Sequence, residues 1–371
     1  MARLAKGFTR RKDGRLQYRF TVNGARYTVY GWTTAEAREK EQQKRQEIAA
    51  GLATRGRNVT VCDYVERWIE GKRGAVKSTT IRTYKRTFPT MLDICVGGRR
   101  FGDMKLVDVE TQDIRLIQQE LTRHHSTRTV NHYIALLSGV MRSAINDERL
   151  IIFNPVVAVK SLRDTAAPAR EGTHRALTKA ETRLFFEHCK KSWYAPLYAF
   201  LLATGCRCGE AGALQVRDVH KDGLQITRTL TMSEDGAAVV GDSTKTESGK
   251  RAIPLTENAR LAITAQKKQN TVTFGNTESI TDIIFRSPTG RKLCSSSVNA
   301  DICKICASAG IDRFCAHAFR DTFATRCIES GMDYKTLQTI MGHSDIGMTM
   351  NLYAHVMQDT KEKQLRAVNF Y

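Results

Sequence analysis

The sequence predicts a multidomain protein that is mainly α-helical and carries small β-sheets. Three observations lead to this fold class: the length of 371 residues, two hairpin signals near the N-terminus, and long stretches with apolar residues three and four positions apart. We expect a three-stranded sheet with one helix at residues 1–56, a helical domain at residues 57–164, and a mixed α+β domain at residues 174–371.

The N-terminal sheet is predicted from its turns. An Asp-Gly pair occupies positions 13–14, and an Asn-Gly pair at positions 23–24 separates the alternating runs QYRFTV and ARYTVY. Both central residues of a tight hairpin turn need positive φ, which Asn and Gly tolerate. Thr33 and Glu36 then have the spacing of a capping box, and Gly51 is a typical helix end. One helix therefore follows three strands.

Apolar spacing predicts helices through the middle of the chain. The expected helical stretches of the second domain are Val61–Lys72, Ser78–Val96, Glu110–His124 and Thr127–Asp147. A linker rich in Pro, Ala and Gly precedes the last domain. There we expect helices at Lys179–Cys189 and Ala195–Thr204, then strands and turns between Leu224 and Leu255, and further helices beyond.

The charge of the chain indicates a polyanionic partner. Lys and Arg number 58 against 38 Asp and Glu, a net charge of +20, and residues 1–57 carry 14 basic and 5 acidic side chains. The longest apolar stretch, Trp193–Cys206, is too short to span a membrane, and the N-terminus lacks the apolar region of a secretory signal. Ten scattered cysteines suit a reducing compartment. We expect a cytoplasmic protein that binds nucleic acid.

Two basic groups are candidate DNA-binding residues. A small basic sheet can enter the major groove, and basic side chains at one helix can clamp phosphates. On the free face of the sheet we expect Arg10, Arg11, Arg15, Arg19 and Arg26, and on the second-domain helix Lys77, Arg82, Lys85 and Arg86. The alternative for both groups is a charged face that only contacts solvent.

Five polar fragments of the last domain share one chemical theme. ATGCRCGE places Arg207 and Glu210 three apart on a helix, and STKTESGKRAIPL is typical of a hairpin that projects Lys245. The remaining fragments follow in the order HAFRDTFATR, with His317 and Arg320; MGHS, with His343 at a helix start; and NLYAH, with Tyr353. Each has an ordinary structural explanation alone, such as a surface ion pair or a core tyrosine. Their order and spacing together are much harder to explain in this way.

In these fragments the sequence resembles the tyrosine recombinase, or phage integrase, family, and it is most similar to integrases of conjugative transposons. The family order Arg, Lys, His-x-x-Arg, His, Tyr is filled at every position. The resemblance implies a tyrosine-recombinase catalytic domain with a C-terminal exchange tail, preceded by a core-site-binding helical domain and an arm-site-binding sheet. The departures are Cys206 and Cys208 beside Arg207, which raise the question of oxidation sensitivity, and Met341 before Gly-His.

The resemblance implies roles for these residues. Arg207 and Arg320 bind the non-bridging phosphate oxygens, and Tyr353 attacks to form a 3′-phosphotyrosyl bond that conserves the phosphodiester energy. His317 accepts the phenol proton, Lys245 protonates the leaving 5′-oxygen, His343 bonds a phosphate oxygen, and Glu210 supports the site; the division between His317 and Lys245 stays open.

No cofactor or metal is expected. The chain lacks a glycine-rich phosphate loop upstream of Gly249-Lys250. Cys303, Cys306, Cys315 and His317 have a spacing that suggests zinc, but the first two are helix neighbours beside isoleucines and fit core thiols better.

The expected activity is site-specific integration and excision of a mobile element, without metal or ATP. The expected partners are double-stranded DNA at core and arm sites, a homo-tetramer on that DNA, and an excisionase-type accessory protein. A Xer-like resolvase and a DNA-binding regulator with this fold are the alternatives, and a type IB topoisomerase shares the chemistry without site preference. The tail packs either on its own domain or on a neighbouring protomer.

Overall fold

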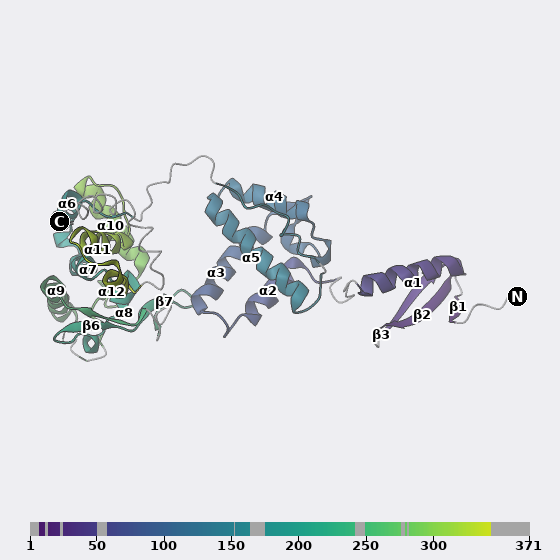
Figure 1. Ribbon diagram of the computed structural model, residues 1–371, viewed down its shortest axis with the longest axis horizontal. Coiled ribbons are helices and arrows are strands. Elements are labelled where there is room, and N and C mark those ends of the chain that lie inside the picture. Colours follow the sequence, from purple (N-terminus) through teal and green to yellow (C-terminus); the bar gives the residue numbers. More distant parts are fainter. Residues whose placement is uncertain are drawn as a thin grey trace, which may run out of the picture. The chain divides into compact units, whose positions relative to one another are not determined.

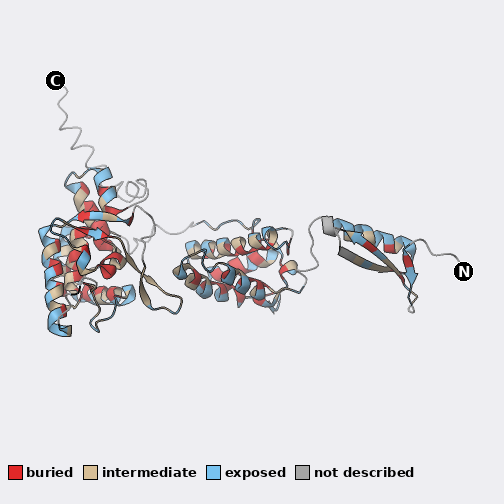
Figure 2. Cartoon of the chain, turned by 90° about the horizontal axis from the view of Figure 1, so that it is seen from below, coloured by how far each residue is buried: buried red, intermediate tan, exposed pale blue. Residues whose placement is uncertain are grey.

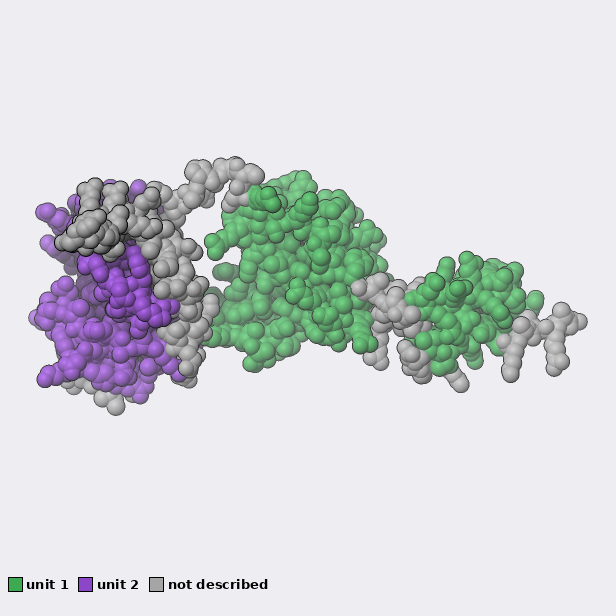
Figure 3. All heavy atoms as spheres, viewed as in Figure 1, with its two compact units in different colours: residues 1–166 green, residues 167–371 purple. Residues whose placement is uncertain are grey.

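The computed structural model divides into two compact units, residues 1–166 and 167–371 (Figure 3). It describes residues 7–11, 14–22, 25–49, 58–151, 153–163, 175–241, 249–275, 279 and 282–342, with only the backbone at residues 25, 26 and 47–49. Within these residues no helix has the length and apolar character that a membrane span requires.

The first unit begins with the predicted three-stranded sheet. Strands β1 (Phe8–Arg10), β2 (Leu16–Val22) and β3 (Ala25–Gly31) pair antiparallel in sequence order, and helix α1 (Thr34–Ala49) lies along one face (Figure 1). The capping pattern at the start of α1 is confirmed: the Glu36 backbone N–H donates to Thr33 Oγ1 at 3.1 Å, and Glu36 Oε2 accepts from the Trp32 N–H at 2.7 Å. Phe8, Leu16 and Ala37 form the small buried core between sheet and helix.

The rest of the first unit is helical, as predicted. Its elements are α2 (Val61–Gly71), α3 (Ser78–Leu92), β4 (Cys95–Val96), β5 (Arg99–Arg100), η2 (Phe101–Asp103), η3 (Leu106–Asp108), α4 (Thr111–Thr122) and α5 (Thr127–Asn146). The side chains of Thr60 and Ser126 cap α2 and α5. The prediction of a helix to Val96 is wrong: α3 ends at Leu92, and Val96 pairs with Arg99 across Gly97 and Gly98, which both have positive φ.

The second unit packs helices around one large core. It contains α6 (Lys179–His188), η4 (Cys189–Lys191), α7 (Ala195–Thr204), α8 (Cys208–Ala213), η5 (Val216–Asp218), β6 (Gly223–Ile226), β7 (Thr229–Met232), β8 (Ala238–Gly241), β9 (Arg251–Pro254), α9 (Glu257–Phe274), α10 (Ser295–Ala309), α11 (His317–Glu329) and α12 (Tyr334–Met341). Buried residues gather on the inward faces of these helices (Figure 2). Phe185, Tyr198, Phe314 and Phe319 form an aromatic cluster where α6, α7 and α11 meet. This cluster fixes α11 against α7.

The strands of the second unit form two antiparallel pairs. β9 pairs with β6, and β8 pairs with β7. The sequence predicts that STKTESGKRAIPL folds as a hairpin, but residues 242–248, which include Lys245 and most of that hairpin, lie outside the described residues. Because Ile253 of β9 and Leu224 of β6 are both buried, burial of apolar side chains selects the longer-range pairing of β9 with β6. The segment between β8 and β9 therefore connects two different sheets.

Gly205 sets the direction of the chain between α7 and α8. It is the left-handed C-cap of α7, with φ of 64°, and its N–H donates to Leu201 O. A Cβ at this position would lie 2.4 Å from Cδ1 of Phe323 on α11. The position therefore needs glycine for its backbone conformation and for its close approach to α11.

We expect Gly205→Ala to destabilise the second unit more than Gly310→Ala does. Gly310 is the C-cap of α10 with φ of 66° and no atom within 4 Å of an added Cβ, so its variant loses only about 1 kcal/mol to backbone strain. Gly205→Ala adds overpacking against Phe323, about 1–3 kcal/mol more. Urea unfolding of the two variants measures the difference, and equal losses would contradict the steric explanation.

Candidate active site

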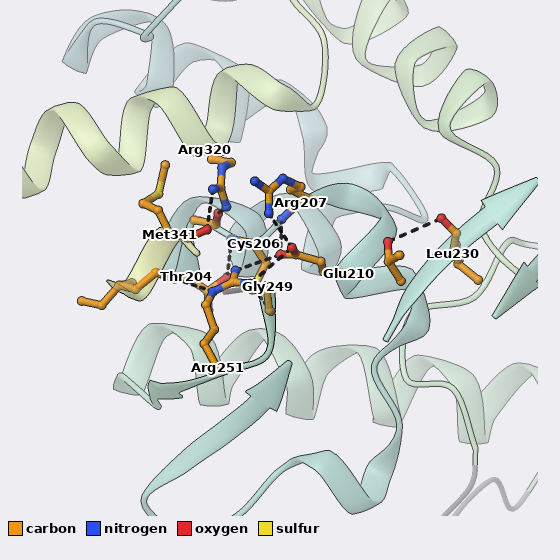
Figure 4. A network of polar contacts seen from close by, with 12 residues as sticks. Thr204, Cys206, Arg207, Glu210, Leu230, Gly249, Arg251, Arg320 and Met341 are labelled. Carbon is orange, nitrogen blue, oxygen red and sulfur yellow. Dashed lines mark hydrogen bonds and ion pairs between the residues drawn. The ribbon is translucent and has the colours of Figure 1, made fainter. Parts of the chain in front are cut away.

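Arg207 and Glu210 form the N-terminal turn of α8, as the spacing predicts. Arg207 is the N-cap residue, and its backbone N–H donates to Glu210 Oε2 at 2.9 Å. Its side-chain Nη1 donates to Glu210 Oε1 at 2.8 Å (Figure 4). The Arg207 side chain is 40% exposed whereas that of Glu210 is 3% exposed, so a buried carboxylate holds a guanidinium that still reaches solvent.

Arg251, at the start of β9, is a site residue that the sequence interpretation missed. Its Nη2 donates to Glu210 Oε2 at 2.8 Å and its Nη1 to Glu210 Oε1 at 3.2 Å (Figure 4). Nε donates to the backbone oxygen of Ile340 at 2.5 Å, and the side chain is only 4% exposed. One signal was available: Arg251 is two residues before Ile253 in a strand, which places a charge on the core-facing side.

Arg320 enters the same cluster from the first turn of α11. Its Nη1 donates to Gly205 O at 2.7 Å and its Nη2 to Met341 O at 2.5 Å. The residue is 1% exposed, and within the described part of the chain its Nε–H has no hydrogen-bond partner. The two carbonyls thus accept from only two of the five N–H donors of this buried guanidinium.

The cluster is electrostatically unbalanced. Two guanidiniums, Arg207 and Arg251, bond the Glu210 carboxylate, and Arg320 interacts with these three groups through its charge. The four groups sum to three minus one, a net charge of +2. Burial would raise the pKa of Glu210, but the hydrogen bond from Arg251 and the charges of Arg251 and Arg207 hold it at about 2. Burial, then the charge of Arg207, lowers the pKa of Arg320 to about 10. Such a cluster favours an anionic ligand.

His317 begins α11 and lies beside a buried carboxylate. Its Nε2 is 3.8 Å from Asp321 Oδ1, four residues along the helix, and the Asp321 side chain is 4% exposed. A carboxylate at this distance stabilises the protonated imidazole. The predicted placement of His317 and Arg320 three apart on one helix is confirmed.

Lys245, His343 and Tyr353 lie outside the residues that the structure describes. Lys245 belongs to the connection between β8 and β9, four residues before Gly249. His343 directly follows Gly342, the left-handed C-cap with which α12 ends. Arg251 belongs to β9, which follows the connection that contains Lys245. It also contacts α12, after which His343 comes in the sequence.

Of the two cysteines beside Arg207, Cys206 is buried and Cys208 is half-buried. Burial raises the pKa of both thiols to about 11, which disfavours the thiolate that oxidation needs. Cys306 lies in the core as expected, and no metal-binding group of three or more His, Cys, Asp or Glu side chains exists among the described residues.

The register of the N-terminal sheet shows which of the predicted DNA-binding arginines lie on its free face. Arg19 pairs with Thr28 on the face opposite Leu16 and Phe20, and Arg11 and Arg15 lie over the ring of Tyr30, which pairs with Gln17 on that same face. Arg26 occupies the position opposite Thr21, and its side chain is outside the described part. Only the face predicted for Arg10 is wrong: Arg10 pairs with Leu16 and so belongs to the side of the sheet on which α1 lies, although its side chain is exposed.

The predicted phosphate clamp is on α3. Lys77 is its N-cap residue, Lys85 and Arg86 are exposed and Arg82 is half-buried, while Ile81, Phe88 and Met91 face the core. Arg82, Lys85 and Arg86 therefore lie on the side of the helix away from the core, and Lys77 precedes its first turn.

The chain is similar to known DNA-rearranging proteins over most of its length. Residues 175–359 match the model of the phage integrase family. The transposase of transposon Tn916 from Enterococcus faecalis is 25% identical over 397 residues, which covers 99% of this chain and 95% of that protein. A XerC-like tyrosine recombinase from Caldanaerobacter subterraneus is 25% identical over 386 residues, covering 96% and 97%.

Solved structures agree with these relatives. The Tn1549 transposon integrase in complex with transposon right end DNA has a TM-score of 0.67 at 25% identity, covering 84% of this chain and 99% of that one. A lambda integrase tetramer bound to a Holliday junction has a TM-score of 0.61 at 19% identity, covering 92% and 96%. The second match supports the fold.

Stability is expected to fall in acid partly through Glu210. Its pKa is about 2 in the folded chain against an ordinary 4.5, so the folded state binds fewer protons and loses this stabilisation as pH falls from about 4.5 toward 2. Urea unfolding between about pH 5.5 and 3.5 should show a shallower loss for Glu210→Gln than for wild type. Glu181→Gln is the matched variant, because Arg175 lowers the pKa of the Glu181 carboxylate to about 2 as well. An unchanged slope in Glu210→Gln would refute this assignment.

Proposed function

Because the chain belongs to the phage integrase family of tyrosine recombinases, we propose that its chemistry is carried by Arg207, Lys245, His317, Arg320, His343 and Tyr353, with Glu210 in support. The protein is a site-specific recombinase of the mobile-element integrase type, which cuts and rejoins DNA strands through a 3′-phosphotyrosyl intermediate. The assignment of roles rests on one observation above all, the positive cluster around Glu210.

The cluster matches the charge that develops during strand cleavage. Attack of a phenol on a phosphodiester passes through a crowded, doubly negative state, and the four linked groups carry a net charge of +2. Arg207 presents an exposed guanidinium to a phosphate oxygen. Arg320 is bonded to the Gly205 and Met341 carbonyls, which use two of its five N–H donors, so its guanidinium adds positive charge beside Arg207. The transition state thus gains charge stabilisation from fixed side chains.

Protons and bonds balance across the proposed step. The Tyr353 oxygen forms a bond to phosphorus while its proton passes to His317, whose imidazolium the neighbouring Asp321 stabilises. The bond from phosphorus to the 5′-oxygen breaks, and Lys245 supplies the proton to that oxygen. His343 bonds a phosphate oxygen. Rejoining reverses these transfers with the 5′-hydroxyl of the partner strand as nucleophile.

The partners follow the same assignment. The N-terminal sheet, residues 1–56, binds arm-site DNA; residues 57–164 bind the core site; and residues 174–371 form the catalytic domain with its exchange tail. Related structures contain transposon end DNA and a tetramer on a Holliday junction, which supports a homo-tetramer on DNA for this chain. An excisionase-type accessory protein and a cytoplasmic, nucleoid-associated location complete the proposal.

Tyr353→Phe is expected to abolish the covalent intermediate while leaving DNA binding intact, because it removes only the nucleophilic oxygen. The substrate is a nicked duplex that carries the end junction of the element encoding the gene, and the products are separated on a denaturing gel. Wild type should give a slow-migrating, SDS-resistant adduct in EDTA, and the variant none.

Two outcomes would overturn the assignment. An adduct that persists in Tyr353→Phe would exclude this nucleophile, and DNA binding without any wild-type adduct would favour a regulator that has lost catalysis. The remaining alternative is a Xer-like resolvase. Deletion of residues 1–57 tests it, because such an enzyme would still recombine without them.

Arg19→Gln is expected to weaken binding to the duplex from the element's end outside the cleavage junction. Loss of one phosphate contact lowers affinity and reduces the slope of log K against log salt by about 1. Arg10→Gln removes the same charge from the opposite face and should leave both quantities unchanged. Fluorescence anisotropy at several salt concentrations measures them, and equal effects of the two variants would refute the face assignment.

A further inference from the structure

Arg251 joins three segments that lie far apart in the sequence. From β9 its guanidinium bonds Glu210 of α8 through two nitrogens, at 2.8 and 3.2 Å, and the backbone oxygen of Ile340 in the last turn of α12 at 2.5 Å. Nη1 also donates to Gly249 O at 3.2 Å, at the end of the connection that carries Lys245. A single side chain thus links the helix start after Arg207, the strand after Lys245 and the helix end before His343.

We propose that Arg251 is a positioning residue for strand cleavage, which sets the geometry of Arg207 through Glu210 and fixes the end of α12 from which His343 follows. This inference rests on the proposed function, because the groups it positions are those assigned to the phosphate.

Only an arginine side chain can make this set of hydrogen bonds. The ammonium of a lysine is a single point, whereas the planar fork of Arg251 spans both oxygens of Glu210 on one side and Ile340 O through Nε. At 4% exposure no bulk solvent replaces a lost bond. Without Arg251, the 3%-exposed Glu210 carboxylate keeps only Arg207 as its cationic partner in the linked cluster, so Arg207 is drawn further toward it and away from a substrate.

The end of α12 depends on the same side chain. Arg320 bonds Met341 O and Arg251 bonds Ile340 O, so two guanidiniums hold consecutive carbonyls at the negative end of the helix dipole. Loss of Arg251 leaves one of these restraints. We therefore expect its removal to impair chemistry more than stability alone explains.

A second Arg–carboxylate ion pair, outside this cluster, provides a control for Arg251 and Glu210. Arg228 bonds both carboxylate oxygens of Asp218 at 2.5 Å, with side chains 16% and 10% exposed. Arg228→Met therefore removes a partly buried Arg–carboxylate pair from the same unit without contacting Glu210 or α12. It reports what a purely structural arginine contributes.

The test measures covalent adduct formation by the full chain on the nicked end-junction duplex. Rates are taken at saturating DNA, at a temperature where circular dichroism shows each variant fully folded, and the Kd for the same duplex is measured in parallel. We expect Arg251→Met to lower the rate at least 30-fold with Kd within threefold of wild type, while Arg228→Met keeps its rate within threefold. Arg251→Lys should recover stability more completely than rate.

Other outcomes decide between positioning, a structural role and a role in binding. If Arg251→Met and Arg228→Met both keep the wild-type rate per folded molecule, Arg251 is only structural. A loss of DNA affinity that matches the loss of rate would assign it to binding. If Arg251→Met does not fold, Arg251→Lys decides: a folded variant at least tenfold slower supports positioning, and a wild-type rate excludes it. A wild-type protein that forms no adduct would instead refute the proposed function itself.

Discussion

The second unit depends on one buried carboxylate shared between two arginines. Glu210 accepts from the backbone and side chain of Arg207 and from two nitrogens of Arg251. A carboxylate at 3% exposure stays charged only because these donors compensate its desolvation, and each donor is held in place by the carboxylate in return. The position of α8 relative to β9, and of β9 relative to α12, follows from this exchange of bonds.

Around this interaction, the excess of positive charge and the constraints on the backbone together favour the binding of an anion. Gly205 turns the chain sharply after α7 and also presents its carbonyl to Arg320, so the same residue ends a helix and satisfies a buried guanidinium. The backbone of α12 supplies a second carbonyl at Met341. Fixed dipoles therefore hold Arg320 beside Arg207 despite their repulsion, and reorganisation on substrate binding is small. In the proposed function, this pre-organised charge serves DNA strand exchange.

Local patterns predicted much of this architecture, and non-local pairing accounts for what they missed. Helix α7 has the bounds expected from its apolar run, with Pro196 near its start and Gly205 at its end, and the Asn-Gly turn predicted the β2–β3 hairpin. Arg207 with Glu210, and His317 with Arg320, follow from helical spacing. The pairing of β9 with β6 and the bond from Arg251 to Ile340, 89 residues away, depend on how distant segments pack, which no local spacing encodes. The sequence interpretation put Arg10 on the wrong face of the sheet. The face depends on the strand register, and a shift of one residue moves a side chain to the other face.

The separate hydrophobic clusters have a consequence for how the molecule unfolds. Among the described residues, the N-terminal sheet and α1 enclose a cluster of three buried residues, and α2 to α5 enclose a much larger one. The second unit has one large cluster and a small one between α11 and α12, and no residue belongs to two clusters. Cooperativity arises within a shared core, so these parts lose structure in separate steps and the smallest melts at the lowest temperature. A single melting temperature does not describe this protein, and each part needs a probe of its own.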